Sequence, residues 1–238
     1  MTKRFGAASF AGAFVILALS RCGPAPGRPT AAEIDVRPDR VTDFPLLYSE
    51  NCAGCHGPSG RGGAGAIGLA DAVYLGVADD AVLRRAAANG IAGTQMPAFA
   101  KTAGGMLTDA QIEILVRGIR GWAKPDALAG AAPPPYAGPP GDAARGAEVF
   151  ARSCASCHGA GGRGGPKAGS VVDGTFLGLV SDQSLRTTII AGRPDIGQPD
   201  WRGDGAVPLT SQNVSDVVAW LAAQRPAHPG QPYAEARP

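Results

Sequence analysis

The sequence predicts an all-α protein built from two tandem helical lobes. The chain matches itself without gaps when it is shifted by 102 residues, which indicates an internal duplication. Its periodic apolar segments have helical spacing, and no convincing alternating strand pattern is present. Gly (35) and Pro (21) make up nearly a quarter of the 238 residues, which favours small packed units joined by loops over long helices or a broad sheet.

The first 21 residues are predicted to be an export signal. A short positive region precedes an uncharged apolar run over residues 5–19. That run is shorter than the roughly 20 residues needed to cross a bilayer core, so a retained membrane helix is less favoured. Leu19–Cys22 resembles a bacterial lipoprotein processing box, although Arg21 departs from the small residue expected there. We favour lipidation of Cys22 over cleavage without lipid or an uncleaved anchor, and all three outcomes place the folded part outside the cytoplasm.

The segment 22–40 is predicted to be a flexible tether, because it is rich in Pro, Ala and Gly and has no apolar periodicity. Without the first 21 residues the chain has 19 basic and 20 acidic residues, a net charge of −1. This balance does not suggest a nucleic-acid partner. We therefore expect a periplasmic or other extracytoplasmic protein held at a membrane.

The repeat defines two domains of about 85 residues, at 41–124 and 142–226. The segment between them, 125–141, contains six prolines and is predicted to be a semi-rigid linker. A short tail, 227–238, follows the second domain.

A helix is predicted to lead into the paired cysteines of each domain. Its buried face is formed by Leu47 and Tyr48 in the first domain and by Val149 and Phe150 in the second. A second helix is expected at about 79–88 and ends at an Asn-Gly pair.

The remaining helices have clear end signals. The counterpart of the second helix begins at Ser181, a good N-cap, and ends at Gly192. The last helix of the first domain begins at Thr108, and Gln111 three residues later completes a capping box. The apolar positions with helical spacing in the two last helices are Ile112, Leu115, Val116, Ile119, Val214, Val217, Val218 and Leu221.

The cysteines indicate the chemistry of the protein. Apart from Cys22 they form two pairs, and Cys52–His56 and Cys154–His158 each read CxxCH, the attachment motif for c-type haem. Cysteines three residues apart on a helical turn share one face, where both sulfurs can bond one edge of a haem, and the following histidine can bind the iron. The predicted haem attachment residues are Cys52, Cys55, Cys154 and Cys157, and the predicted histidine ligands are His56 and His158.

Two CxxCH motifs in repeat register argue against the alternatives of a redox CxxC pair, a zinc site or chance. A zinc site of four cysteines would leave both histidines unexplained. The sequence therefore predicts two covalently bound haem c groups, one in each domain. Because a domain of about 85 residues with few aromatic residues has little core, we expect the haem to supply much of the interior.

Both domains resemble the class I cytochrome c family. In the first domain the resemblance rests on CxxCH, Gly90, Met96 followed by Pro97, and the closing amphipathic helix. In the second it rests on CxxCH, Gly192 and the last helix, which ends near Trp220. It covers about 170 residues and implies two tandem cytochrome c domains, each wrapped around its haem, with a role in electron transfer.

The resemblance also implies an aromatic contact between the first and last helices of each domain. In the second domain the expected pair is Phe150 with Trp220. In the first domain Tyr48 is the clear member, and its partner is left open.

The sixth iron ligand distinguishes the two domains. Met96 matches the family's methionine ligand in the first, and Met106 is expected to be a packing residue next to the helix cap. The second domain has Gln198 opposite Met96 and contains no methionine. Gln198, an open or water-bound site, and another group such as His228 or a partner's side chain all stay open. Since histidine–methionine ligation raises the haem potential, we expect the second haem to have the lower potential.

The favoured function is a di-haem c-type cytochrome that transfers single electrons between redox proteins at the outer face of a bacterial membrane. It is expected to be part of a respiratory or photosynthetic complex, without catalysis of its own. The alternative is a haem enzyme or ligand sensor that uses the second haem.

Three basic residues are candidates for guiding the docking of an acidic partner, namely Arg61, Arg163 and Lys101. The ordinary interpretation of isolated charges on glycine-rich loops is simple solvation.

Overall fold

The computed structural model describes residues 36–63, 66–203 and 207–227. Within these residues the regular structure is helical and there is no β-strand, only isolated bridges, so the predicted all-α class is confirmed. The expected export signal, Cys22 and His228 lie outside the described residues. The chain up to Arg40 forms a unit of its own, whose described part contains the short 3₁₀ helix η2 (Pro38–Arg40).

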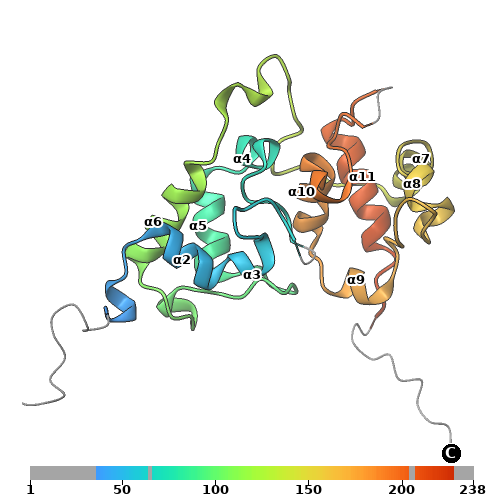
Figure 1. Ribbon diagram of the computed structural model, residues 1–238. Helices are drawn as coiled ribbons and strands as arrows, with labels where there is room; N and C mark the ends of the chain where they lie inside the picture. The colour runs from blue at the N-terminus through green and yellow to red at the C-terminus, as the bar shows by residue number, and fades with distance from the viewer. Residues whose placement is uncertain (1–35, 64–65, 204–206, 228–238) are drawn as a thin grey trace, which may run out of the picture. The chain divides into compact units, whose positions relative to one another are not determined.

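The first lobe follows in chain order along the blue-to-green part of Figure 1. Its helices are α2 (Phe44–Asn51), α3 (Ala53–His56), α4 (Ala72–Val77), α5 (Asp80–Asn89), η3 (Lys101–Ala103) and α6 (Asp109–Arg120). The linker then begins with η4 (Pro125–Leu128).

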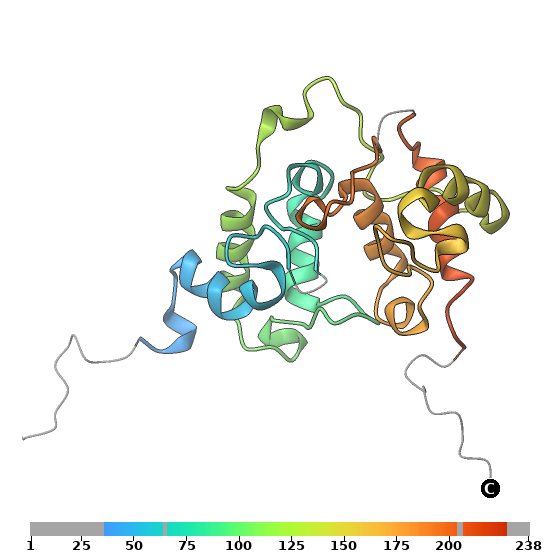
Figure 2. The same cartoon turned by 45° about the vertical axis from the view of Figure 1, so that its right-hand side comes forward.

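The second lobe repeats this order of α-helices, with its 3₁₀ helices at other repeat positions. Its helices are α7 (Ala143–Ser153), α8 (Ala155–His158), η5 (Ala160–Gly162), α9 (Gly174–Gly178), α10 (Asp182–Ala191), η6 (Pro194–Ile196) and α11 (Ser211–Ala222). Figures 1 and 2 both show α7 against α11, the first and last helices of this lobe.

Side-chain caps set the helix ends as the sequence predicts. Thr108 accepts from the backbone N–H of Gln111, whose side chain accepts in return from the backbone N–H of Thr108, and Thr210 forms the same capping box in the second lobe. Ser181 caps α10. The short helices α4 and α9 were not predicted, yet both begin after an aspartate N-cap, at Asp71 and Asp173.

The predicted aromatic contact of the second lobe is confirmed. The rings of Phe150 and Trp220 lie 4.4 Å apart between centroids, and Phe150 is only 3 % exposed. Gly146, one turn before Phe150, lets α7 approach α11 closely, because a Cβ there would lie 2.0 Å from the carbonyl oxygen of Asp216. Such a ring pair contributes about 0.5–1.5 kcal/mol beyond the apolar area that it buries.

In the first lobe the ring opposite Tyr48 belongs to Trp122, with 4.9 Å between the two centroids. The position that matches Trp220 in the repeat is Gly118, and a Cβ there would lie 2.1 Å from the Phe44 ring. Phe44 in turn matches Gly146. In the first lobe the large residue, Phe44, is thus on the first helix and the glycine on the last, whereas in the second lobe the glycine is on the first helix and the tryptophan on the last. Trp122, which lies beyond the end of α6, supplies the ring that packs on Tyr48.

An arginine at the end of each lobe fixes the loop before the middle helix. Arg120 donates to the carbonyl oxygens of Leu75 and Ala78, each at 2.6 Å. Arg225 donates to the corresponding carbonyls of Leu177 and Val180, at 3.0 and 2.9 Å. Arg120 also forms an ion pair with Asp80 at the start of α5, and Arg225 with Asp182 at the start of α10. These bonds satisfy carbonyl groups that the short helices leave free.

The linker is held to the second lobe by a buried arginine. Arg186, 5 % exposed, donates to the carbonyl oxygens of Pro135 and Tyr136 and to the hydroxyl groups of Ser211 and Ser215. Burial lowers the pKa of Arg186, and these hydrogen bonds offset the cost of placing a guanidinium there.

Candidate functional site

The two CxxCH motifs form matching helical turns. The backbone N–H of Cys52 donates to Tyr48 and that of Cys154 to Phe150, both at 2.9 Å, so each motif continues directly from the helix before it. The four cysteines of the motifs are free thiols. Burial, with a smaller contribution from the second cysteine of each motif, raises the pKa of Cys52 and of Cys154 to about 11. Cys52 and Cys154 are therefore protonated thiols, and each lies on the same helical turn as the second cysteine of its motif.

The histidine of each motif has one ring nitrogen already engaged. Nδ1 of His56 lies 2.8 Å from the carbonyl oxygen of Ile67, and Nδ1 of His158 lies 3.2 Å from that of Gly169. A carbonyl can only accept, so Nδ1 carries the proton and Nε2 is left with its lone pair. Burial lowers the pKa of His56, which favours the neutral ring that a metal requires.

The glycine after each histidine closes the loop that carries this carbonyl. Gly57 has a left-handed φ of 80°, and a Cβ there would lie 2.5 Å from the carbonyl oxygen of Gly62. Gly159 has a φ of 75° and stands in the same relation to Gly164, at 2.0 Å. Contacts within the loop itself therefore require glycine at these positions.

In the first lobe Tyr48 connects the first helix to the motif. Its hydroxyl group donates to the carbonyl oxygen of Gly57 at 2.9 Å, and burial raises its pKa to about 12. The side chain is 2 % exposed and its ring packs on Trp122. Tyr48 therefore connects the CxxCH motif to the residues that follow the last helix of the lobe.

Met96 lies in a loop with fixed backbone geometry. Its carbonyl oxygen accepts from the N–H of Ile91 at 3.0 Å, and a Cβ on Gly90 would lie 2.6 Å from that oxygen. Met106 does not pack as expected, because it is 81 % exposed. The neighbouring Leu107 takes the buried place through its bridge with Ala100, and successive residues of an extended segment point to opposite sides.

These residues fit a c-type haem. Each lobe offers two free thiols on one turn and a histidine whose Nε2 is uncommitted. The second lobe also exposes several large apolar side chains that an apolar macrocycle would cover, namely Phe176, Leu179, Ile196 and Val207. Within the described residues there is no group of three or more His, Cys, Asp or Glu that could hold a separate metal ion.

Comparison with known proteins gives a family match in each lobe. The model described as "Cytochrome c" matches residues 143–224, and "Cytochrome C oxidase, cbb3-type, subunit III" matches residues 39–117. The chain belongs to the cytochrome c family. Together with the paired CxxCH motifs, this establishes a di-haem c-type cytochrome with two covalently bound haem c groups.

The chain is also similar to individual proteins. The cytochrome is 34 % identical over 185 residues to "Cbb3-type cytochrome c oxidase subunit FixP" of Azorhizobium caulinodans, which covers 74 % of this chain and 58 % of the relative. It is 34 % identical over 191 residues to "Cbb3-type cytochrome c oxidase subunit CcoP" of Azospirillum sp., covering 73 % and 53 %. The chain thus spans between half and three fifths of the length of these relatives. A solved "KustC0563 c-type cytochrome" is 28 % identical with a TM-score of 0.31, covering 34 % of this chain and 99 % of that one.

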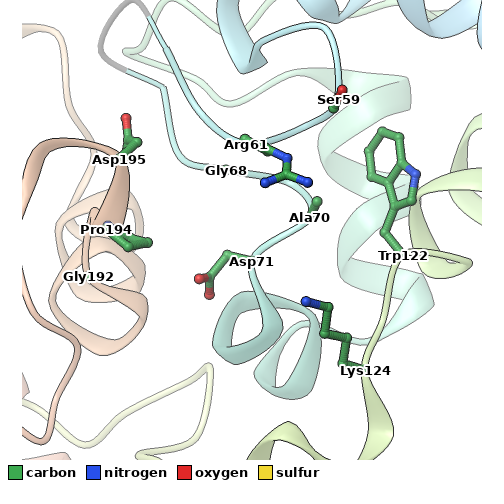
Figure 3. A pocket seen from close by; sticks show the side chains of 10 residues that line it. All are labelled: Ser59, Arg61, Gly68, Ala70, Asp71, Trp122, Lys124, Gly192, Pro194 and Asp195. Carbon is green, nitrogen blue, oxygen red and sulfur yellow. The ribbon is translucent and has the colours of Figure 1, made fainter.

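The structure also contains a cavity of about 600 Å³. Figure 3 shows its lining, which includes Arg61, Asp71, Trp122 and Lys124 but none of the CxxCH side chains. Arg61 is exposed, as are Arg163 and Lys101, the other two candidate docking residues.

Within residues 36–227, apart from the short segments that are not described, every helix is too short or too polar to span a lipid bilayer.

Proposed function

We propose that this cytochrome transfers single electrons between redox proteins at the outer face of a bacterial membrane, as a subunit of a respiratory oxidase complex. The observation that carries the proposal is the repeated motif: two CxxCH turns on one chain, each with a histidine oriented through Nδ1. The relatives named as cbb3-type oxidase subunits support membership of such a complex.

Each lobe has its own set of attachment residues. Cys52 and Cys55 would anchor the first haem and Cys154 and Cys157 the second, with His56, Met96 and His158 as the iron ligands. When bound, haem supplies a one-electron couple between ferric and ferrous iron. The carbonyl oxygens of Ile67 and Gly169 hold the two imidazole rings in the tautomer that leaves Nε2 available.

The difference between Met96 and Gln198 predicts which of the two haems has the higher potential. A thioether ligand favours ferrous iron and raises the potential, whereas the second lobe has no methionine to offer. We expect electrons to enter through the second lobe and leave through the first.

The acidic residues near Gln198 support a carrier over an enzyme. Asp195 accepts from Arg193 at 2.8 and 2.7 Å, and Asp200 accepts from Arg202. The Arg193 guanidinium also lowers the pKa of Asp195 through this hydrogen bond. Both carboxylates are therefore engaged by arginine partners, which removes the obvious candidates for a proton donor at the second haem.

The location is part of the proposal. An exported, membrane-held chain, with Cys22 as the site of lipid attachment, would keep the two lobes near membrane-bound partners. The mass of the mature N-terminal peptide tests it: a diacylglycerol adduct on Cys22 supports lipidation, and a free N-terminus elsewhere argues against it.

The functional test uses membranes from cells that contain or lack a cbb3-type oxidase. The cytochrome, reduced and freed of excess reductant, is mixed with each membrane preparation in air, and haem absorbance is followed. We expect rapid, cyanide-sensitive reoxidation with oxidase-containing membranes only. Reoxidation at the same rate in both preparations would contradict the proposed partner class.

A further inference from the structure

The segment of the second lobe that stands opposite Met96 keeps the same backbone geometry. Arg193 donates its N–H to the carbonyl oxygen of Gln198 at 3.0 Å, the same bond that Ile91 makes to Met96. Gly192, like Gly90, has a left-handed φ, of 73°, and has no room for a Cβ. The side chain at 198 therefore leaves the backbone where the methionine ligand does in the first lobe.

The carboxamide of Gln198 is oriented by a single hydrogen bond. Its Nε2 donates to the carbonyl oxygen of Thr188 at 3.3 Å, near the end of α10. Only the NH₂ group of an amide can donate to a carbonyl, so this contact fixes which end is nitrogen. Oε1 lies at the opposite end and has no hydrogen-bond partner among the described residues.

The other polar side chains of the 192–200 segment are already committed. Arg193 and Asp195 pair with each other, and Asp200 pairs with Arg202. Gln198 is only partly buried. Its amide oxygen is thus the one side-chain acceptor of this segment that has no hydrogen-bond partner within the described structure.

We propose that Gln198 binds the iron of the second haem through Oε1, as a weak and exchangeable sixth ligand. This rests on the proposed role of the second lobe as a haem-carrying domain. A carbonyl oxygen is a hard donor that favours ferric iron, in contrast to the soft thioether of Met96. The same lobe therefore has a low potential and an iron that small ligands, such as cyanide, can reach by displacing the amide.

The test uses the full-length chain, produced in a host that attaches haem c, with variants Gln198→Ala and Gln198→Met. In the wild type we expect one thioether-to-iron charge-transfer band, from the first lobe. Gln198→Met is expected to double that band. Gln198→Ala should bind cyanide at the second haem about tenfold faster, which follows if the amide occupies the iron about 90 % of the time.

Gln224→Ala is the matched control, because Gln224 is an exposed glutamine of the same lobe. Its side chain makes a single hydrogen bond within the described residues, a long one of 3.5 Å to the carbonyl oxygen of Trp220. It should leave both the band and the cyanide rate unchanged. Two haems per chain with Gln198→Ala and Gln198→Met both indistinguishable from the wild type in electron paramagnetic resonance, band intensity and cyanide rate would overturn this proposal alone. A chain with one haem would overturn the proposed function as well.

Discussion

Gly146 in α7 offers the most direct test of the helix contact that organises the second lobe. A Cβ at this position would lie 2.0 Å from the carbonyl oxygen of Asp216 and 2.7 Å from Cβ of Trp220. The nearest atom belongs to the backbone of α11 and cannot rotate away. Gly146→Ala therefore requires the two helices to separate by about 1 Å, which also loosens the contact of Phe150 with Trp220.

The expected cost follows from two opposing effects. Overpacking a rigid contact costs up to about 3 kcal/mol, and the higher helix propensity of alanine returns about 1 kcal/mol. The net loss of about 2 kcal/mol corresponds to a fall of about 10 °C in the Tm of a domain of this size. Thermal unfolding of the full haem-loaded chain, followed by far-UV circular dichroism, measures it, and amide exchange in α7 and α11 assigns it to this lobe.

The control is Gly174→Ala, a helical glycine of the same lobe in α9, where the atom nearest to the added Cβ is Cγ of Pro226 at an ordinary contact distance of 3.4 Å. It should be as stable as the wild type or slightly more stable. If Gly146→Ala is also as stable as the wild type, the close approach of α7 and α11 is not what holds this lobe together.

Two further predictions concern neighbouring contacts. Gly118→Ala should destabilise the first lobe, because its Cβ would lie 2.1 Å from the Phe44 ring, but should be neutral or stabilising in a Phe44→Ala background; additive effects in urea unfolding would refute the direct contact. Asp216, 2 % exposed, has its pKa lowered to about 2 by the hydrogen bond from Arg145. A lowered carboxyl pKa gives stability that is complete above about pH 4 and is lost as the pH falls to 2, amounting to about 2 kcal/mol. Urea midpoints between pH 2 and 6 should show this slope in the wild type and not in Asp216→Asn.

Much of the fold could be predicted because the signals are local. The capping box at Thr108, the N-cap at Ser181 and the apolar positions of the last helices follow from spacing alone, and the structure places them as expected. Helices α4 and α9 are too short for an apolar period to show. Their one usable signal was the pair of aspartate caps, Asp71 and Asp173, which stand in repeat register.

The sequence does not predict contacts that are made by residues at different repeat positions in the two lobes. The gap-free alignment pairs Trp220 with Gly118, so it does not indicate that Trp122 provides the ring in the first lobe. It also pairs Arg120 with Ala222, whereas Arg225 makes the equivalent bonds three residues later. In both cases a side chain from a neighbouring turn reaches the same place, which depends on three-dimensional packing rather than on position in the sequence.

At the site, the sequence predicts the chemistry and the structure adds the orientation. The CxxCH spacing indicates haem attachment, but the carbonyl partners of the two histidines come from Ile67 and Gly169, 11 residues further on in each case, in glycine-rich loops without a recognisable pattern. The hydrogen bond that orients Gln198 likewise depends on where α10 ends.

The division of labour between the lobes depends on their potentials. Spectroelectrochemical titration of the full chain, with each haem identified by its own ligand-field spectrum, measures both in one experiment. We predict that the histidine–methionine centre at His56 and Met96 is reduced first on lowering the potential, and the centre at His158 second. Equal potentials, or the reverse order, would contradict electron flow from the second lobe to the first.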